Sequence, residues 1–203
     1  MTDGVITGSF AQVVGTFDLV QGTGTIDYVT PVHIATESDD VADEGIRLIG
    51  ETDAKQKLFD KIVNPQRNSC NPQAQKGTYE EFVPVAPTLQ RIGLLIKEVM
   101  AAEFTRGSAA PTGTVAFGAP SPDAPHRVPL EATSVTAPVR GVTYSVQARP
   151  EGAAAWQTIA VGLPTPSAEV DVNQFPGAKG VSVRVLRSDG FSETEVFQGH
   201  RAF

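Results

Sequence analysis

The segment Val142-Thr143-Tyr144-Ser145-Val146-Gln147-Ala148-Arg149 decides the fold class, because its apolar and polar residues alternate without interruption. Successive side chains of a β-strand point to opposite faces of the sheet. The alternation therefore places the apolar residues of the segment on one face and the polar residues on the other. We expect a strand that lies with one face on a hydrophobic core and the other toward solvent.

Short strands with turn residues between them continue along the second half of the chain. The runs at 156–161, 168–172 and 181–185 are rich in apolar and β-branched residues. Asp189-Gly190 separates the last of them from a further run at 191–197, and an Asp-Gly pair in this position is a strong hairpin signal. Several short strands at such spacing are typical of an antiparallel β-sandwich.

The first half also contains candidate strands, at 5–10, 12–20, 25–32, 45–52, 57–63 and 78–85. The segment 89–104 fits two different structures. Ile92, Ile96 and Met100 recur at helical spacing, whereas Ile92-Gly93-Leu94-Leu95-Ile96 is also typical of a buried strand. We favour two strands that turn near Lys97-Glu98.

A change of composition at 107–125 divides the chain, because this segment is rich in Gly, Pro, Ala and Ser. Pro-rich segments act as semi-rigid spacers and do not join central strands. The 203 residues have room for two domains of about 100 residues each. The sequence therefore predicts an all-β protein with two tandem antiparallel β-sandwich domains, at 1–107 and 108–203.

Composition excludes several classes of function. The net charge of −7 argues against nucleic acid as a partner, because affinity for phosphate backbones depends on clustered Lys and Arg. No apolar run is long enough to span a membrane, and the first ten residues do not resemble a signal peptide. The single cysteine, Cys70, excludes an internal disulfide and is interpreted as an incidental thiol in the polar loop 64–77.

No catalytic motif is visible in the sequence. The three histidines, His33, His126 and His200, lie in separate regions and form no closely spaced pair of metal ligands. No Gly-x-Ser-x-Gly nucleophile motif or phosphate-binding loop is present. We therefore predict that the chain is not an enzyme and uses no cofactor.

Two features are candidate binding sites. The acidic segment 37–44 holds five carboxylates that could bind Ca²⁺, although it lacks the order of an EF-hand loop and is more simply a solvated loop; they are Glu37, Asp39, Asp40, Asp43 and Glu44. Trp156 could stack on a sugar ring as a ligand platform, but its place beside an apolar run favours packing in the core.

The second half resembles the fibronectin type III-like sandwiches of large secreted bacterial proteins, and the matching segments are 141–147, 155–163 and 181–191. The first half is similar to the β-sandwich that often precedes such a module, at 45–50, 79–84, 89–96 and 110–112. In those proteins the tandem is a C-terminal accessory region, frequently behind a zinc metalloprotease. The resemblance implies two immunoglobulin or fibronectin type III-like domains in an extracytoplasmic, non-catalytic module.

These observations predict an accessory, spacer or binding module of a larger exported protein, which presents its loops rigidly to a protein or a surface polymer. Such a module would be monomeric. A virion or filament subunit is an alternative, because the sequence begins with Met1 and shows no export signal, and it would form homo-oligomers. A carbohydrate-binding module is a second alternative and requires an exposed Trp156 or tyrosine.

Overall fold

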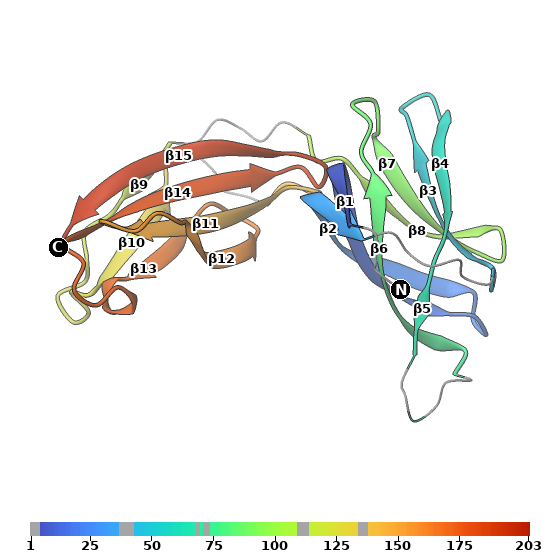
Figure 1. Ribbon diagram of the computed structural model, residues 1–203, viewed down its shortest axis with the longest axis horizontal. Helices are drawn as coiled ribbons and strands as arrows, with labels where there is room; N and C mark the ends of the chain where they lie inside the picture. The colour runs from blue at the N-terminus through green and yellow to red at the C-terminus, as the bar shows by residue number, and fades with distance from the viewer. Residues whose placement is uncertain (1–4, 37–42, 68–69, 71–73, 109–113, 134–137) are drawn as a thin grey trace. The chain divides into compact units, whose positions relative to one another are not determined.

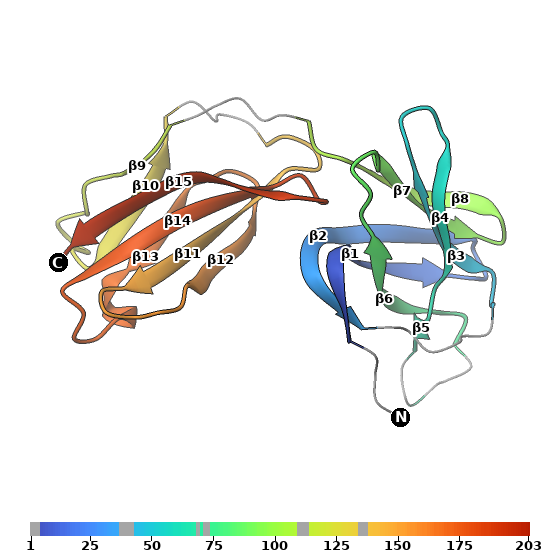
Figure 2. The same cartoon turned by 45° about the horizontal axis from the view of Figure 1, so that its top comes forward.

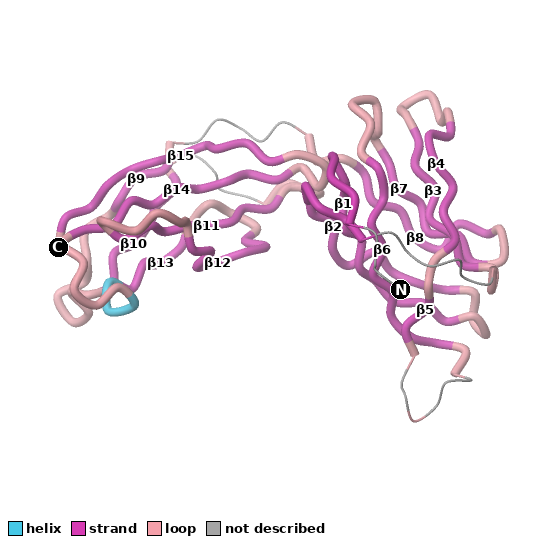
Figure 3. The backbone as a smooth tube through the Cα atoms, viewed as in Figure 1, coloured by secondary structure: helices cyan, strands magenta, loops and turns pink. Residues whose placement is uncertain are grey.

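The computed structural model describes residues 5–36, 43–67, 70, 74–108, 114–133 and 138–203. All regular structure in these residues is β-strand, except for one short 3-10 helix, Val172–Gln174 (Figure 3). The strands form antiparallel sheets. The all-β fold class expected from the sequence is therefore confirmed. The chain divides into two compact units, Met1–Arg106 and Gly107–Phe203.

The first unit contains two sheets of four strands (Figure 1). One has the order β2-β1-β6-β5 and consists of β1 (Val5–Asp18), β2 (Thr23–Thr36), β5 (Pro65–Gln66) and β6 (Lys76–Pro84). The other has the order β4-β3-β7-β8 and consists of β3 (Ile46–Glu51), β4 (Lys57–Ile62), β7 (Arg91–Ile96) and β8 (Val99–Thr105). The runs at 5–10 and 12–20, which we expected to be separate, belong largely to the single strand β1.

The segment 89–104 is the β-hairpin β7–β8, so the interpretation as two strands is confirmed. Its turn residues Lys97 and Glu98 have φ of 50° and 67°. Two successive left-handed residues match the twist of a tight hairpin, which usually contains Asn-Gly. The Lys97 backbone N–H donates to the carbonyl of Gly45, 2.7 Å away, and fixes the turn against the start of β3.

A close fit of three residues joins the strands of the first sheet. Tyr79 on β6 is fully buried, and its hydroxyl donates to the backbone carbonyl of Thr25 on β2, 2.8 Å away. The ring reaches that carbonyl across Gly15 of the intervening strand β1. A Cβ atom at Gly15 would lie 2.0 Å from the Thr25 oxygen and 2.5 Å from the Tyr79 hydroxyl. Only glycine fits at this position.

The second unit is a seven-stranded sandwich (Figure 2). A three-stranded sheet has the order β13-β10-β9 and contains β9 (Val115–Phe117), β10 (Arg127–Ala132) and β13 (Ala168–Asp171). A four-stranded sheet has the order β12-β11-β14-β15 and contains β11 (Thr143–Pro150), β12 (Gln157–Leu163), β14 (Gly180–Ser188) and β15 (Glu193–Ala202). The fifth strand of the unit, β13, returns to the sheet of the first two, which is the Greek-key crossing of fibronectin type III-like sandwiches.

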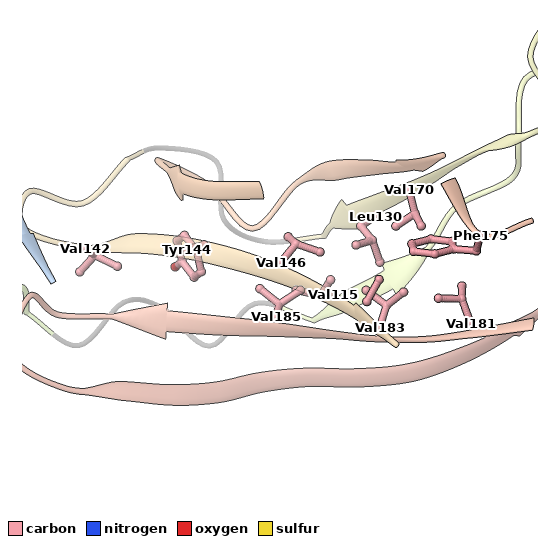
Figure 4. Close-up of a cluster of buried hydrophobic side chains, with 11 residues drawn as sticks. Val115, Leu130, Val142, Tyr144, Val146, Val170, Phe175, Val181, Val183 and Val185 are labelled. Carbon is pink, nitrogen blue, oxygen red and sulfur yellow. The ribbon is translucent and has the colours of Figure 1, made fainter. Parts of the chain in front are cut away.

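The core of the second unit fills the space between its two sheets (Figure 4). The alternating apolar residues of 142–148 face this core, as the sequence predicted. They pack with residues from both sheets, including Val115, Leu130, Val170, Val183 and Val185. Burial of this apolar surface is the main source of stability for a unit of this size.

Candidate functional site

Trp156 lies outside the core of the second unit, so our expectation of core packing was wrong. It directly precedes β12 and is half-buried. Gln147 on β11 pairs with Thr158 on β12, and both face away from the core. The pairing of β11 with β12 is irregular around Val146, so the regular alternation of faces along β12 is broken beyond Thr158. Sequence alternation alone could not show this irregularity.

Two arginine side chains lie over the Trp156 ring. The guanidinium carbon of Arg149 is 4.7 Å from the ring centroid, and that of Arg184 is 4.5 Å from it. Arg149 comes from β11 and Arg184 from β14, both at outward-facing positions of adjacent strands. Each contact is a cation–π interaction, in which the positive charge meets the negative face of the indole. We name Arg149, Trp156 and Arg184 the Arg–Trp–Arg cluster.

Neighbouring polar side chains hold Arg184 in place. Its Nε donates to the Gln147 side-chain oxygen, 2.8 Å away, and the amide nitrogen of Gln147 donates to the Thr158 hydroxyl, 3.2 Å away. The Arg184 guanidinium is also 3.8 Å from a carboxylate oxygen of Glu195 on β15. The cluster is therefore supported by side chains from all four strands of this sheet.

The guanidinium of Arg149 has a different environment from that of Arg184. Among the described residues, Arg149 has no carboxylate partner and no side-chain hydrogen bond. Its guanidinium makes a cation–π contact with the Trp156 indole. Other arginines of the described chain do contact carboxylates: Arg47, Arg67, Arg91, Arg127 and Arg184. Because a stacked guanidinium uses its face, the N–H groups along its edge remain available as donors.

The acidic segment 37–44 is only partly within the described residues, because Glu37, Asp39 and Asp40 lie outside them. Asp43 accepts a hydrogen bond from the Gly45 backbone N–H and lies 3.8 Å from the Arg47 guanidinium. Glu44 pairs with Arg67, and this hydrogen bond holds the pKa of the Glu44 carboxyl below its usual value, although partial burial opposes the shift. The described part of the chain contains no group of three or more metal-ligating side chains.

The three histidines occupy different elements. His33 lies on β2 of the first unit, His126 precedes β10, and His200 lies on β15. His126 uses its backbone carbonyl to accept from Val172, next to the 3-10 helix. Cys70 is exposed.

A buried ion pair joins the two sheets of the first unit and was not found from the sequence. The Glu81 side chain on β6 is 3% exposed, and its carboxylate lies 2.8 Å from the Lys61 ammonium on β4. The Asn64 backbone N–H donates to the same carboxylate, 2.6 Å away, and Lys61 also donates to the Phe82 carbonyl. In the sequence Glu80-Glu81 is simply an acidic pair; the inward position of Glu81 follows from its register between Tyr79 and Val83, which are both buried.

An open depression of about 470 Å³ lies beside the end of the β1–β2 hairpin. A row of threonines on three neighbouring strands contributes to its wall: Thr25, Thr16 and Thr78. The Thr16 and Thr25 hydroxyls are hydrogen-bonded at 2.7 Å.

No protein-family model matches the chain, and no curated protein matches it. Among solved structures, the chain is similar to the crystal structure of chicken CNTN1 FN1–FN3 domains, with 11% sequence identity and a TM-score of 0.34. The match covers 98% of this chain and 63% of the other. No helix in the described residues is long and apolar enough to cross a membrane.

Proposed function

We propose that the chain is a non-catalytic accessory module that presents binding loops from two rigid β-sandwich units, within a larger exported protein. The observation that carries this proposal is that each unit has a closed hydrophobic core of its own and a surface on which charged side chains pair across strands. On the outer face of β3 and β7, Arg91 lies between Glu51, at 2.9 Å, and Glu103, at 3.3 Å. Charges that pair with one another in this way support the proposed scaffold role.

Exposed apolar residues in a turn, at a strand start and on an edge strand support a binding role. Val20 in the β1–β2 turn is 77% exposed, and Val99 at the start of β8 is 64% exposed. Val161 on the edge strand β12 of the second unit is 61% exposed. A partner could cover such side chains, although single exposed apolar residues are normal on a protein surface. The partner class that we propose is a protein or a surface polymer.

A virion or filament subunit is the second candidate, and the edge strands favour it. Within the described residues, β15 pairs only with β14 along its ten residues. A long edge with unpaired backbone groups can add a strand from a second copy. The charges of Glu193, Glu195 and Arg201 on β15 oppose such pairing, which is why we place this function second.

The solution mass distinguishes the two functions. Light scattering across a concentration series should give the mass of one chain, 21.4 kDa, at every concentration if the protein is an accessory module. A discrete oligomer, or a mass that increases with concentration, would contradict the module and support the subunit. If an oligomer is found, substitution of Val196 on β15 by Lys tests whether this edge forms it. A charge at a paired edge should dissociate the oligomer into monomers.

A further inference from the structure

The Arg–Trp–Arg cluster is more than a support for the sandwich, because one of its cations is not neutralised. Arg184 is held by Gln147 and lies near Glu195, so its charge is partly balanced. Arg149 contacts the indole and, within the described residues, no carboxylate. A charge left without a counter-ion on a half-buried side chain attracts an anion from outside the molecule.

The geometry of the cluster sets the shape of its ligand. The two guanidiniums lie over the indole at 4.7 and 4.5 Å, so little of the ring face remains for a sugar to stack on. The donors that remain are the N–H edges of Arg149, and an arginine edge matches a carboxylate by two parallel hydrogen bonds. The cluster therefore suits a carboxylate better than a pyranose ring, which argues against the carbohydrate-binding alternative at Trp156.

The charge of the whole chain limits the size of this ligand. Residues 107–203 contain seven Lys or Arg and eight Asp or Glu, whereas residues 1–106 contain nine and fifteen. A long polyanion would meet repulsion from the acidic majority, but a single short acidic segment would sense mainly the local cations, because salt screens charges beyond about 8–10 Å. Glu195 on β15 lies near Arg184, on the side of β14 away from β11 and Arg149, so a carboxylate ligand meets less repulsion at Arg149 than at Arg184.

We propose that the Arg–Trp–Arg cluster on the outer face of the β12-β11-β14-β15 sheet binds a carboxylate of a short acidic peptide segment in a partner protein. Arg149 accepts the carboxylate as a bidentate partner, Trp156 holds the Arg149 side chain in place, and Arg184 adds a second positive charge. The inference rests on the proposed binding function and names the chemistry of the partner.

Trp156 makes the site directly measurable, because it is the only tryptophan in the chain. The experiment is a titration of the intact chain with a hexaglutamate peptide, followed by Trp156 fluorescence and calorimetry, with hexaglutamine as the neutral control. We expect a saturable change with hexaglutamate alone. Arg149→Gln should weaken binding by at least about tenfold, the factor expected for the loss of one charged hydrogen bond.

Two further variants keep the test decisive. Arg127→Gln is the matched control, because Arg127 lies on β10 in the other sheet, where it pairs with Glu169, and it should bind hexaglutamate as the wild type does. Arg149→Lys keeps the charge but not the paired donors, and it should bind between the wild type and Arg149→Gln. If Arg149→Gln perturbs folding, Arg149→Lys supplies the comparison.

The inference is overturned by any of three results: no saturable response of the wild type, equal losses in Arg149→Gln and Arg127→Gln, or binding of a sulfated polysaccharide without binding of hexaglutamate. These results are separable from failure of the proposed function. A monomer that ignores hexaglutamate contradicts the carboxylate site alone, whereas an oligomer in light scattering contradicts the accessory module.

Discussion

Replacing Lys61 with Met should destabilise the first unit by about 3 kcal/mol, because the Glu81 carboxylate would remain buried without its ammonium partner. Removal of one partner from a buried pair costs roughly 3–5 kcal/mol. Two features place the loss at the lower end. The Asn64 N–H still donates to the carboxylate, and the Lys61 side chain is 23% exposed, so water can partly replace it.

Urea and thermal unfolding followed by circular dichroism measure this loss. A domain of roughly 100 residues loses about 4 °C of Tm or more per kcal/mol, so we expect a decrease on the order of 10 °C. Trp156 fluorescence reports on the second unit, since the tryptophan lies there, and it identifies that unit's transition if two are seen. The Lys61→Met variant and the wild type should be compared at the same pH and salt concentration.

Lys57→Met is the matched control, because Lys57 lies on the same strand and pairs with Asp60 at 2.7 Å while its side chain is 55% exposed. Exposed pairs contribute roughly 0–1 kcal/mol, so this control should change stability little. The double variant Lys61→Met with Glu81→Leu should recover most of the loss, since it removes both charges. If Lys61→Met costs no more than Lys57→Met, the buried pair is not the constraint that we describe.

Four further predictions concern other parts of the chain. Gly15→Ala should cost about 1–3 kcal/mol in urea unfolding, because the new methyl group meets the Thr25 carbonyl, and a wild-type midpoint would contradict the fit described above. Hydrogen bonds from Lys57 and Arg47 hold the pKa of Asp60 below its usual value, despite partial burial that raises it. The ionised carboxylate therefore stabilises the fold above the unfolded pKa, and the Tm difference between wild type and Asp60→Asn should shrink as the pH falls below about 4. Trp156→Ala should cost about 1–2 kcal/mol rather than the roughly 3–5 of a core aromatic, and a larger loss would return Trp156 to the core. Chelator should leave Tm unchanged, whereas a clear decrease would assign calcium to the acidic segment 37–44.

The strands of the second unit could be predicted closely, because burial of one face of a strand produces alternating apolar and polar residues in the sequence. The alternation of 142–149 became β11, and the Asp189-Gly190 signal marks the turn before β15. The start of β15 was placed too early, since Phe191 is buried in the turn itself. Its N–H donates to the Asp189 side chain within that turn.

The first unit and the candidate site were harder to predict. The Lys97-Glu98 turn contains neither Gly nor Asn, so nothing in its composition separated a hairpin from a helix. Trp156 was misplaced because the apolar run beside it belongs to β12, an edge strand whose residues are exposed or half-buried. The partners of Trp156 are distant in the sequence, and cation–π contacts leave no pattern of spacing that a single chain could reveal.

The fit among Gly15, Thr25 and Tyr79 has a consequence for folding. β1 and β2 are each 14 residues long, and long paired strands can slip by one residue, which turns every side chain to the wrong face. A slip of β1 against β6 would bring Val14 or Thr16 opposite Tyr79 in place of Gly15, and a slip of β1 against β2 would move the Thr25 carbonyl away from Gly15. Gly15 therefore leaves room for Tyr79 in one alignment of the strands only. This single contact in the interior of the sheet favours the native register over a slipped one.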